Sequence, residues 1–157
     1  MPVRDATPAD LDVIVELIGA LAAYERLEHE VVLDPAELAR HLFGPEPVAH
    51  VVLATDDRGT DHRGTHDSGA VVGFALWFPT FSTFLGRPGI WLEDLFVRPE
   101  ARGAGHGRAL IEHLRSLTDG RLEWSVLDWN EPAQGFYRSL GAAPHDGWTT
   151  WRWAPPT

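Results

Sequence analysis

Two acidic residues inside an otherwise apolar stretch are the first sign of chemistry in this sequence. Glu93 and Asp94 lie between Leu92 and Leu95, in a run whose apolar residues are typical of a strand. A buried carboxylate without a partner costs free energy, so two of them in such a run need a reason. One reason is a salt bridge to an arginine, and the other is a role in a reaction site. The sequence leaves both interpretations open.

Side-chain alternation separates these two acids. In a regular strand, neighbouring side chains point to opposite faces. Glu93 and Leu95 are therefore expected on one face of the sheet, and Asp94 and Phe96 on the other. We expect one carboxylate to line the reaction site and the other to bind substrate or a partner.

A glycine-rich turn follows the same stretch. Pro99 ends the strand because proline cannot donate to a ladder, and residues 102–107 then read Arg-Gly-Ala-Gly-His-Gly. Leu110, Ile111 and Leu114 follow with the spacing of one helix face. The first N–H groups of a helix have no internal partner, and the helix dipole favours negative charge there. The turn therefore predicts a site for a phosphate-bearing molecule.

The spacing of the turn narrows the choice of phosphate carrier. A P-loop needs a lysine after its last glycine, and none follows here. A dinucleotide fingerprint needs Gly-x-Gly-x-x-Gly, whereas Arg108 stands where the third glycine would be. The pattern Arg-x-x-Gly-x-Gly after Leu95–Val97 resembles the coenzyme A signature of the Gcn5-related N-acetyltransferases (GNAT). A plain strand-to-helix turn is the alternative.

Further segments resemble one branch of that family. Residues 124–142, with Trp-Asn-Glu-Pro before Phe-Tyr and Gly-Ala, are similar to the diamine (spermidine/spermine-type and thialysine-type) N-acetyltransferases. Residues 92–97 and 23–25 look like the same branch. The resemblance covers nearly the whole chain and is weakest after Thr55 and at the C-terminus. Residues 81–89 lack some of the aromatic and acidic residues expected of a polyamine-binding lip, which leaves the acceptor open.

The resemblance implies acetyl-CoA as the co-substrate and no metal. The turn would give backbone N–H groups to the diphosphate, with charge-assisted contacts from Arg102 or Arg108 unless these are ordinary surface arginines. The strand would splay from its neighbour and bind the pantetheine arm through main-chain groups near Leu95 and Val97, one of which would polarise the thioester carbonyl. The expected cofactor-binding residues are Leu95, Phe96, Val97, Arg102, Gly103, Ala104, Gly105, His106, Gly107, Arg108, Asn130, Phe136 and Tyr137.

Two residues are candidates for the catalytic groups, the first of them by resemblance to the family. Tyr137 matches the tyrosine that protonates the coenzyme thiolate, and the alternative is a tyrosine packed in the core. Glu93 is the expected base, acting directly or through water. Tyr24 and Glu25 would form the far wall of a substrate site completed by Glu93 and Asp94, although Glu25 can equally be a solvated helix end. The chain has no cysteine, so direct attack by the amine in a ternary complex is the simplest route.

We therefore expect an N-acetyltransferase that acts on a small cationic amine: a diamine, a polyamine or a lysine-like amino acid. A peptide or protein amine is the second interpretation, and a non-catalytic coenzyme A sensor is the third. Trp148, Trp151 and Trp153 suggest either a partner surface or core packing, and relatives commonly form homodimers.

Composition agrees with a compact enzyme. The chain has 157 residues, 44% of them hydrophobic, with 23 acidic against 13 basic residues and a net charge of −10. The negative charge argues against nucleic acid and anionic membranes. No targeting segment or membrane span is recognisable, so a cytoplasmic location is expected.

Hydrophobic periodicity and turn residues predict an α/β fold. Helices are expected from Thr7 to about Tyr24, from Asp34 to Phe43, after the glycine turn, and from 133 to about 140, with Thr7, Asp34 and Asn130 as the caps of the first, second and last. Strands are expected at 2–4, 48–54, 70–78, 92–97, 122–127 and 148–153, with a loop at 55–69 that carries His62 and His66. The predicted architecture is a single domain over residues 1–157. Its central sheet is mixed, mostly antiparallel and splayed in the middle, with helices on both faces.

Overall fold

The computed structural model describes residues 2–56 and 69–154. The chain divides into two compact units, Met1–Ser125 and Val126–Thr157. The first unit holds the sheet and the glycine-rich turn, and the second holds the last helix and the C-terminal segment. Within the described ranges, no helix has both the length and the apolar character needed to cross a bilayer.

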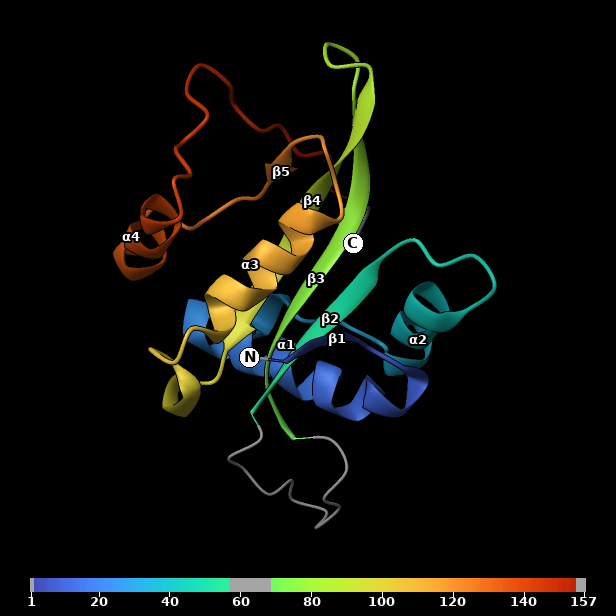
Figure 1. The fold of residues 1–157 in the computed structure, drawn as a ribbon. Helices are drawn as coiled ribbons and strands as arrows, with labels where there is room; N and C mark the ends of the chain where they lie inside the picture. Colours follow the sequence, from blue (N-terminus) through green and yellow to red (C-terminus); the bar gives the residue numbers. More distant parts are fainter. Residues whose placement is uncertain (1, 57–68, 155–157) are drawn as a thin grey trace. The chain divides into compact units, whose positions relative to one another are not determined.

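The first unit is built on a five-stranded sheet in the order β1-β2-β3-β4-β5 (Figure 1). Neighbouring strands pair antiparallel except β4 and β5, which run parallel. The predicted α/β fold with a mixed, mostly antiparallel sheet is confirmed. The strands are β1 (Val3–Asp5), β2 (His50–Asp56), β3 (Ala70–Ser82), β4 (Arg87–Val97) and β5 (Leu122–Glu123).

Helices cover both faces of this sheet (Figure 1). They are α1 (Leu11–Glu25), α2 (Pro35–Phe43) and α3 (His106–Ser116), with short 3-10 turns at Pro8–Asp10, Glu28–Glu30 and Pro99–Ala101. The predicted helix starts are confirmed. The Asp10 carboxylate accepts a hydrogen bond from the Thr7 N–H at 2.8 Å, and Asp34 accepts one from the Ala36 N–H at 2.9 Å.

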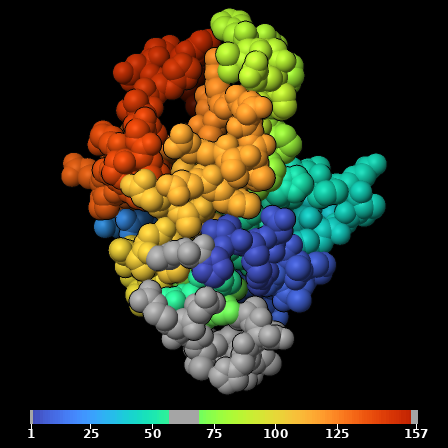
Figure 2. Space-filling view, in the orientation of Figure 1, coloured from blue at the N-terminus to red at the C-terminus, as the bar shows by residue number. Residues whose placement is uncertain are grey.

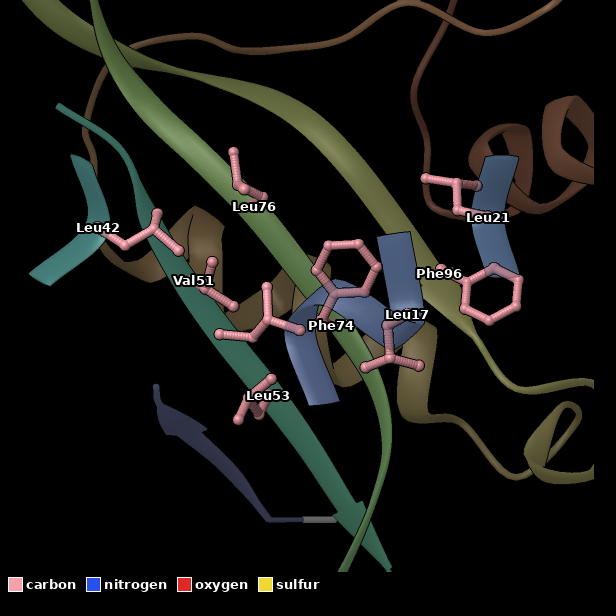
Figure 3. Close-up of a cluster of buried hydrophobic side chains, with 9 residues drawn as sticks. Leu17, Leu21, Leu42, Val51, Leu53, Phe74, Leu76 and Phe96 are labelled. Atoms are coloured by element: carbon pink, nitrogen blue, oxygen red, sulfur yellow. The ribbon is translucent and has the colours of Figure 1, made fainter. Parts of the chain in front are cut away.

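The core beneath α1 fixes the position of β4. Residues spaced three and four apart on α1 meet alternate residues of β2 and β3, so that the apolar face of the helix is buried against the sheet (Figure 3). Each large side chain buried in this way contributes roughly 1.5–3 kcal/mol relative to exposure. The cluster consists of Ile14, Leu17, Leu21, Leu42, Val51, Leu53, Phe74, Leu76 and Phe96.

One edge of β4 is open over its second half. β5 pairs only with Ile90 and Trp91 of β4, so in the described part of the chain no strand pairs with that edge beyond Trp91. The N–H of Arg98 donates to the Val72 carbonyl on β3 at 2.8 Å. Since main-chain groups alternate sides along a strand, those of Leu95 and Val97 point away from β3. The predicted splay therefore opens beside Leu95 and Val97.

A β-bulge lies in the middle of the same strand. Leu76 pairs with Asp94 and Trp77 pairs with Leu92, which leaves Glu93 without a partner in the ladder. The regular alternation that we expected through Glu93 and Asp94 is therefore interrupted here. Leu92 is buried outside the cluster beneath α1, whereas Phe96 belongs to it.

The second unit contains α4 (Glu131–Ser139) and differs from expectation at its end. The Asn130 side chain accepts a hydrogen bond from the Ala133 N–H at 3.2 Å, which confirms the predicted cap. The predicted strand at 148–153 is wrong. These residues form no strand, and Trp148, Trp151 and Trp153 are 74%, 92% and 98% exposed. Alternating tryptophans favour a strand, but a strand also needs a partner edge for its main-chain groups, and the segment has none within its unit.

Two other predicted elements differ. The strand expected at 122–127 is limited to Leu122–Glu123, because the chain leaves β4 after that point. The first part of the expected loop, Thr55 and Asp56, belongs to β2, while His62 and His66 lie outside the described residues.

Candidate active site

The glycine-rich turn presents unpaired N–H groups at the start of α3. Gly105 is the N-cap with φ of 94°, and no side chain caps the helix. The first helical hydrogen bond runs from the Ala109 N–H to the Gly105 carbonyl at 3.0 Å. The N–H groups of His106, Gly107 and Arg108 come before it in the chain and therefore have no acceptor within the helix. The turn lies at the surface (Figure 2, yellow). These features fit an anion such as a diphosphate.

The arginines of the turn are both engaged with the protein. The guanidinium of Arg102 lies over the rings of Tyr24 and Phe96, at 4.9 and 5.5 Å from their centroids. Its Nε donates to the Val97 carbonyl at 2.9 Å. Arg108 pairs with Glu112 one turn along α3, at 3.7 Å. Arg102 therefore links the turn to the end of α1, a contact that the sequence did not predict.

The open edge of β4 lies directly before the turn. Leu95 and Val97 direct main-chain groups toward this edge, whereas the main chain of Phe96 pairs with Phe74 on β3. An extended, amide-containing ligand can add to such an edge by main-chain hydrogen bonds. Of the three residues expected to bind the pantetheine arm, the geometry thus favours Leu95 and Val97.

Three carboxylates meet at the bulge of β4 and the end of α1. Burial, and then the charges of Glu93 and Glu25, together raise the pKa of Asp94 to about 7. Burial also raises the pKa of Glu25. In residues 2–56 and 69–154, no ion pair involves Glu93 or Asp94, so the salt-bridge interpretation finds no support. The three form a concentrated negative site that favours a cation.

Glu93 is more exposed than Asp94 and has a neutral partner. Its Oε2 accepts a hydrogen bond from the Trp91 indole N–H at 2.8 Å. Sequence reasoning missed Trp91, although its position two residues before Glu93 places both on one face of a strand. Tyr24, on the last turn of α1, is 36% exposed beside Arg102.

The remaining predicted residues belong to the second unit. Asn130 is buried and caps α4, while Phe136 and Tyr137 lie on that helix with ring centroids 5.3 Å apart. Tyr137 is partly buried. The described residues contain no group of three or more His, Cys, Asp or Glu side chains that could hold a metal ion.

Comparison with known proteins gives consistent matches. Residues 24–142 match the model of the acetyltransferase (GNAT) family. The chain is 35% identical to the thialysine N-epsilon-acetyltransferase of Bos taurus, over 96% of this chain and 90% of that protein. It is 30% identical to the L-ornithine N5-acetyltransferase NATA1 of Arabidopsis thaliana, over 93% of this chain and 81% of that protein. A crystal structure of a probable acetyltransferase has the same fold, with a TM-score of 0.77 at 21% identity over 100% of this chain and 99% of that one.

Proposed function

Because the chain belongs to the GNAT family of acetyltransferases, we propose that it transfers the acetyl group of acetyl-CoA to a primary amine of a small cationic acceptor. A diamine, a polyamine or a lysine-like amino acid fits this description. The observation that carries the proposal is the cluster of Glu25, Glu93 and Asp94, whose mutual repulsion a cationic acceptor would relieve. The similarity to enzymes named for thialysine and ornithine supports the same acceptor class.

Different residues of the first unit bind the coenzyme and deprotonate the amine. When bound, acetyl-CoA supplies a thioester carbonyl open to attack by an amine. The N–H groups at the start of α3 hold the diphosphate, and the open edge of β4 at Leu95 and Val97 orients the pantetheine arm and polarises the carbonyl. An amine arrives protonated at neutral pH and must lose a proton before it can attack. Asp94, whose pKa is about 7, accepts that proton more readily than an ordinary carboxylate would.

Glu93 and Tyr137 complete the proposed chemistry. Glu93 binds the cationic acceptor beside Asp94, and it remains the second candidate for the base, acting directly or through water. Tyr137 holds the proton that the departing thiolate takes up. With no cysteine in the chain, attack occurs directly in a ternary complex.

A panel of amines tests the acceptor class. Spermidine, diaminopropane, ornithine, lysine, thialysine and a lysine-containing peptide are compared with a neutral-tailed monoamine, and free thiol is measured as acetyl-CoA is consumed. We expect acceptors with a second cationic group to have a kcat/KM at least about tenfold above the monoamine, the equivalent of about 1.4 kcal/mol from the acidic cluster. Activity on the peptide alone would favour the protein-amine interpretation. Binding of acetyl-CoA without turnover on any acceptor would favour the sensor.

Other properties of the chain stay predictions. These are its organisation as a single domain, its cytoplasmic location and its assembly as a homodimer. The excess of acidic over basic residues, 23 against 13, supports a small cationic partner over nucleic acid or an anionic membrane.

Substitution of Gly105 tests the diphosphate turn. Gly105 has φ of 94°, a conformation that costs other residues roughly 1–2 kcal/mol. We expect Gly105→Ala to raise the Kd for acetyl-CoA by about tenfold, because the strained turn moves the N–H groups at the start of α3. Isothermal titration calorimetry measures this directly.

A matched control separates strain from binding. Gly86, in the β3–β4 hairpin, also has positive φ (64°), and a Cβ there would meet no atom within 4 Å. Gly86→Ala should cost similar stability and leave acetyl-CoA affinity unchanged. Equal affinity losses in the two variants would show that the turn has no special role.

A further inference from the structure

The side chain of His106 is buried behind the glycine-rich turn without a hydrogen bond. Only 2% of the residue is exposed, and neither Nδ1 nor Nε2 has a hydrogen-bond partner. Nε2 lies 3.8 Å from Oδ2 of Asp56, the last residue of β2, whose side chain is 21% exposed. A buried polar ring without partners costs free energy, so its presence at this position calls for a function.

The position of His106 connects it to the diphosphate site. It is the first residue of α3, and its own N–H is one of the groups that precede the first helical hydrogen bond. The ring therefore lies on the protein side of the turn, and the ligand would lie on the solvent side. A positive charge at this place opposes the helix dipole, but a bound anion would favour it.

Asp56 is the ionisable group that faces the ring. In the described residues it is the one carboxylate within 4.0 Å of His106. Three arginines on the elements around the turn pair with other carboxylates, while Arg102 of the turn itself bonds the Val97 carbonyl. These pairs are Arg4 of β1 with Asp10, Arg98 after β4 with Glu16, and Arg108 of α3 with Glu112.

We propose that His106 and Asp56 form an ion pair behind the glycine-rich turn, and that protonation of His106 is linked to binding of the coenzyme diphosphate. This pair is called the brace below. Binding of the coenzyme diphosphate favours the imidazolium form of His106, paired with Asp56, and the proton comes from solvent. The positive charge of the ring strengthens diphosphate binding in return, because the two equilibria are linked. The inference rests on the proposed function, because it needs acetyl-CoA at the turn.

Calorimetry in buffers of different ionisation enthalpy measures the proton directly. At pH 7, wild-type protein should take up more protons per acetyl-CoA bound than His106→Leu, because the variant has no imidazole to become charged. The titration of the coenzyme's own phosphate is common to both proteins and cancels in the difference. Between pH 6 and pH 8, the Kd of the wild type should rise about three- to tenfold more than that of the variant.

Two further variants make the result specific. His113→Leu makes the same change seven residues along α3 and should retain the wild-type proton uptake. Asp56→Asn keeps the shape of the side chain and should reduce the uptake, which provides a test even if His106→Leu fails to fold. In NMR spectra of wild type, one of the eight histidine signals should report a more protonated ring after acetyl-CoA is added.

The outcomes separate the inference from the function on which it rests. No binding of acetyl-CoA to the wild type would overturn the proposed function. Binding with equal proton uptake in wild type, His106→Leu and Asp56→Asn would overturn the brace alone and leave the acetyltransferase proposal standing.

Discussion

Replacing Tyr137 with phenylalanine should lower kcat by about 10²- to 10⁴-fold while acetyl-CoA affinity changes little. A phenol can give its proton to a thiolate leaving group, and phenylalanine removes that proton while it keeps the ring. The ring contact with Phe136, at 5.3 Å between centroids, needs no hydroxyl, so α4 should persist. Steady-state thiol release gives kcat, and calorimetry gives the Kd for acetyl-CoA.

The proton-donor role of Tyr137 predicts a second property of the Tyr137→Phe variant. A thioester whose thiol is more acidic needs less help to depart, so the variant should recover part of its rate with such a donor. Ser139→Ala serves as the control, because it removes a hydroxyl two residues along the same helix and leaves the phenol in place. A Tyr137→Phe variant with unchanged kcat would remove Tyr137 from the mechanism and leave it as a packing residue.

Local signals in the sequence predicted the fold and the glycine-rich turn. Caps, prolines and glycines act on their own neighbours, which is why the helix starts at Thr7, Asp34 and Asn130 and the start of α3 after the turn were correctly predicted. The splay of β4 from β5 was implied by family resemblance, and the register beyond Trp91 confirms it.

Features that depend on tertiary context were missed. The bulge at Glu93 follows from pairing with β3, and no residue type within β4 predicts it. The contacts of Arg102 with Tyr24 and of His106 with Asp56 join residues far apart in sequence. The strand predicted at 148–153 does not form for a related reason. Its sequence pattern favours a strand, but the pattern cannot supply the partner strand that the segment needs.

The acidic cluster was predicted in part from the sequence and depends in part on tertiary structure. The sequence identified Glu25, Glu93 and Asp94 as candidates and favoured Glu93 as the base. The structure leaves Glu93 exposed with a hydrogen bond from Trp91, and it is Asp94 whose pKa is raised to about 7. Burial decides between two adjacent carboxylates, and burial is a tertiary property.

Asp94→Asn should therefore lower activity and raise stability at the same pH. In the wild type we expect kcat/KM to rise with pH through an apparent pKa near 7, as Asp94 becomes able to accept a proton, in addition to the rise from the amine itself. In Asp94→Asn, the rise of kcat/KM near pH 7 (the limb of the pH profile) should be absent, and kcat/KM at pH 8 should be about 10²-fold lower. A Glu93→Gln variant that keeps this limb would identify Asp94 as the base; loss of the limb in Glu93→Gln alone would assign the role to Glu93.

The stability of Asp94→Asn provides an independent check of the same group. The pKa of Asp94 is higher in the folded protein, about 7, than the ordinary value of 3.8, so ionisation opposes folding. The wild type should lose stability as pH rises from about 4 to 7 by on the order of 1–3 kcal/mol, a range that allows for solvent screening of a partly buried group. The uncharged asparagine is free of this loss, so the variant should be the more stable protein at pH 8, and the difference should shrink toward pH 4. Urea unfolding at the two pH values measures it, and a variant that is less stable at pH 8 would contradict the assignment of a strained carboxylate to this site.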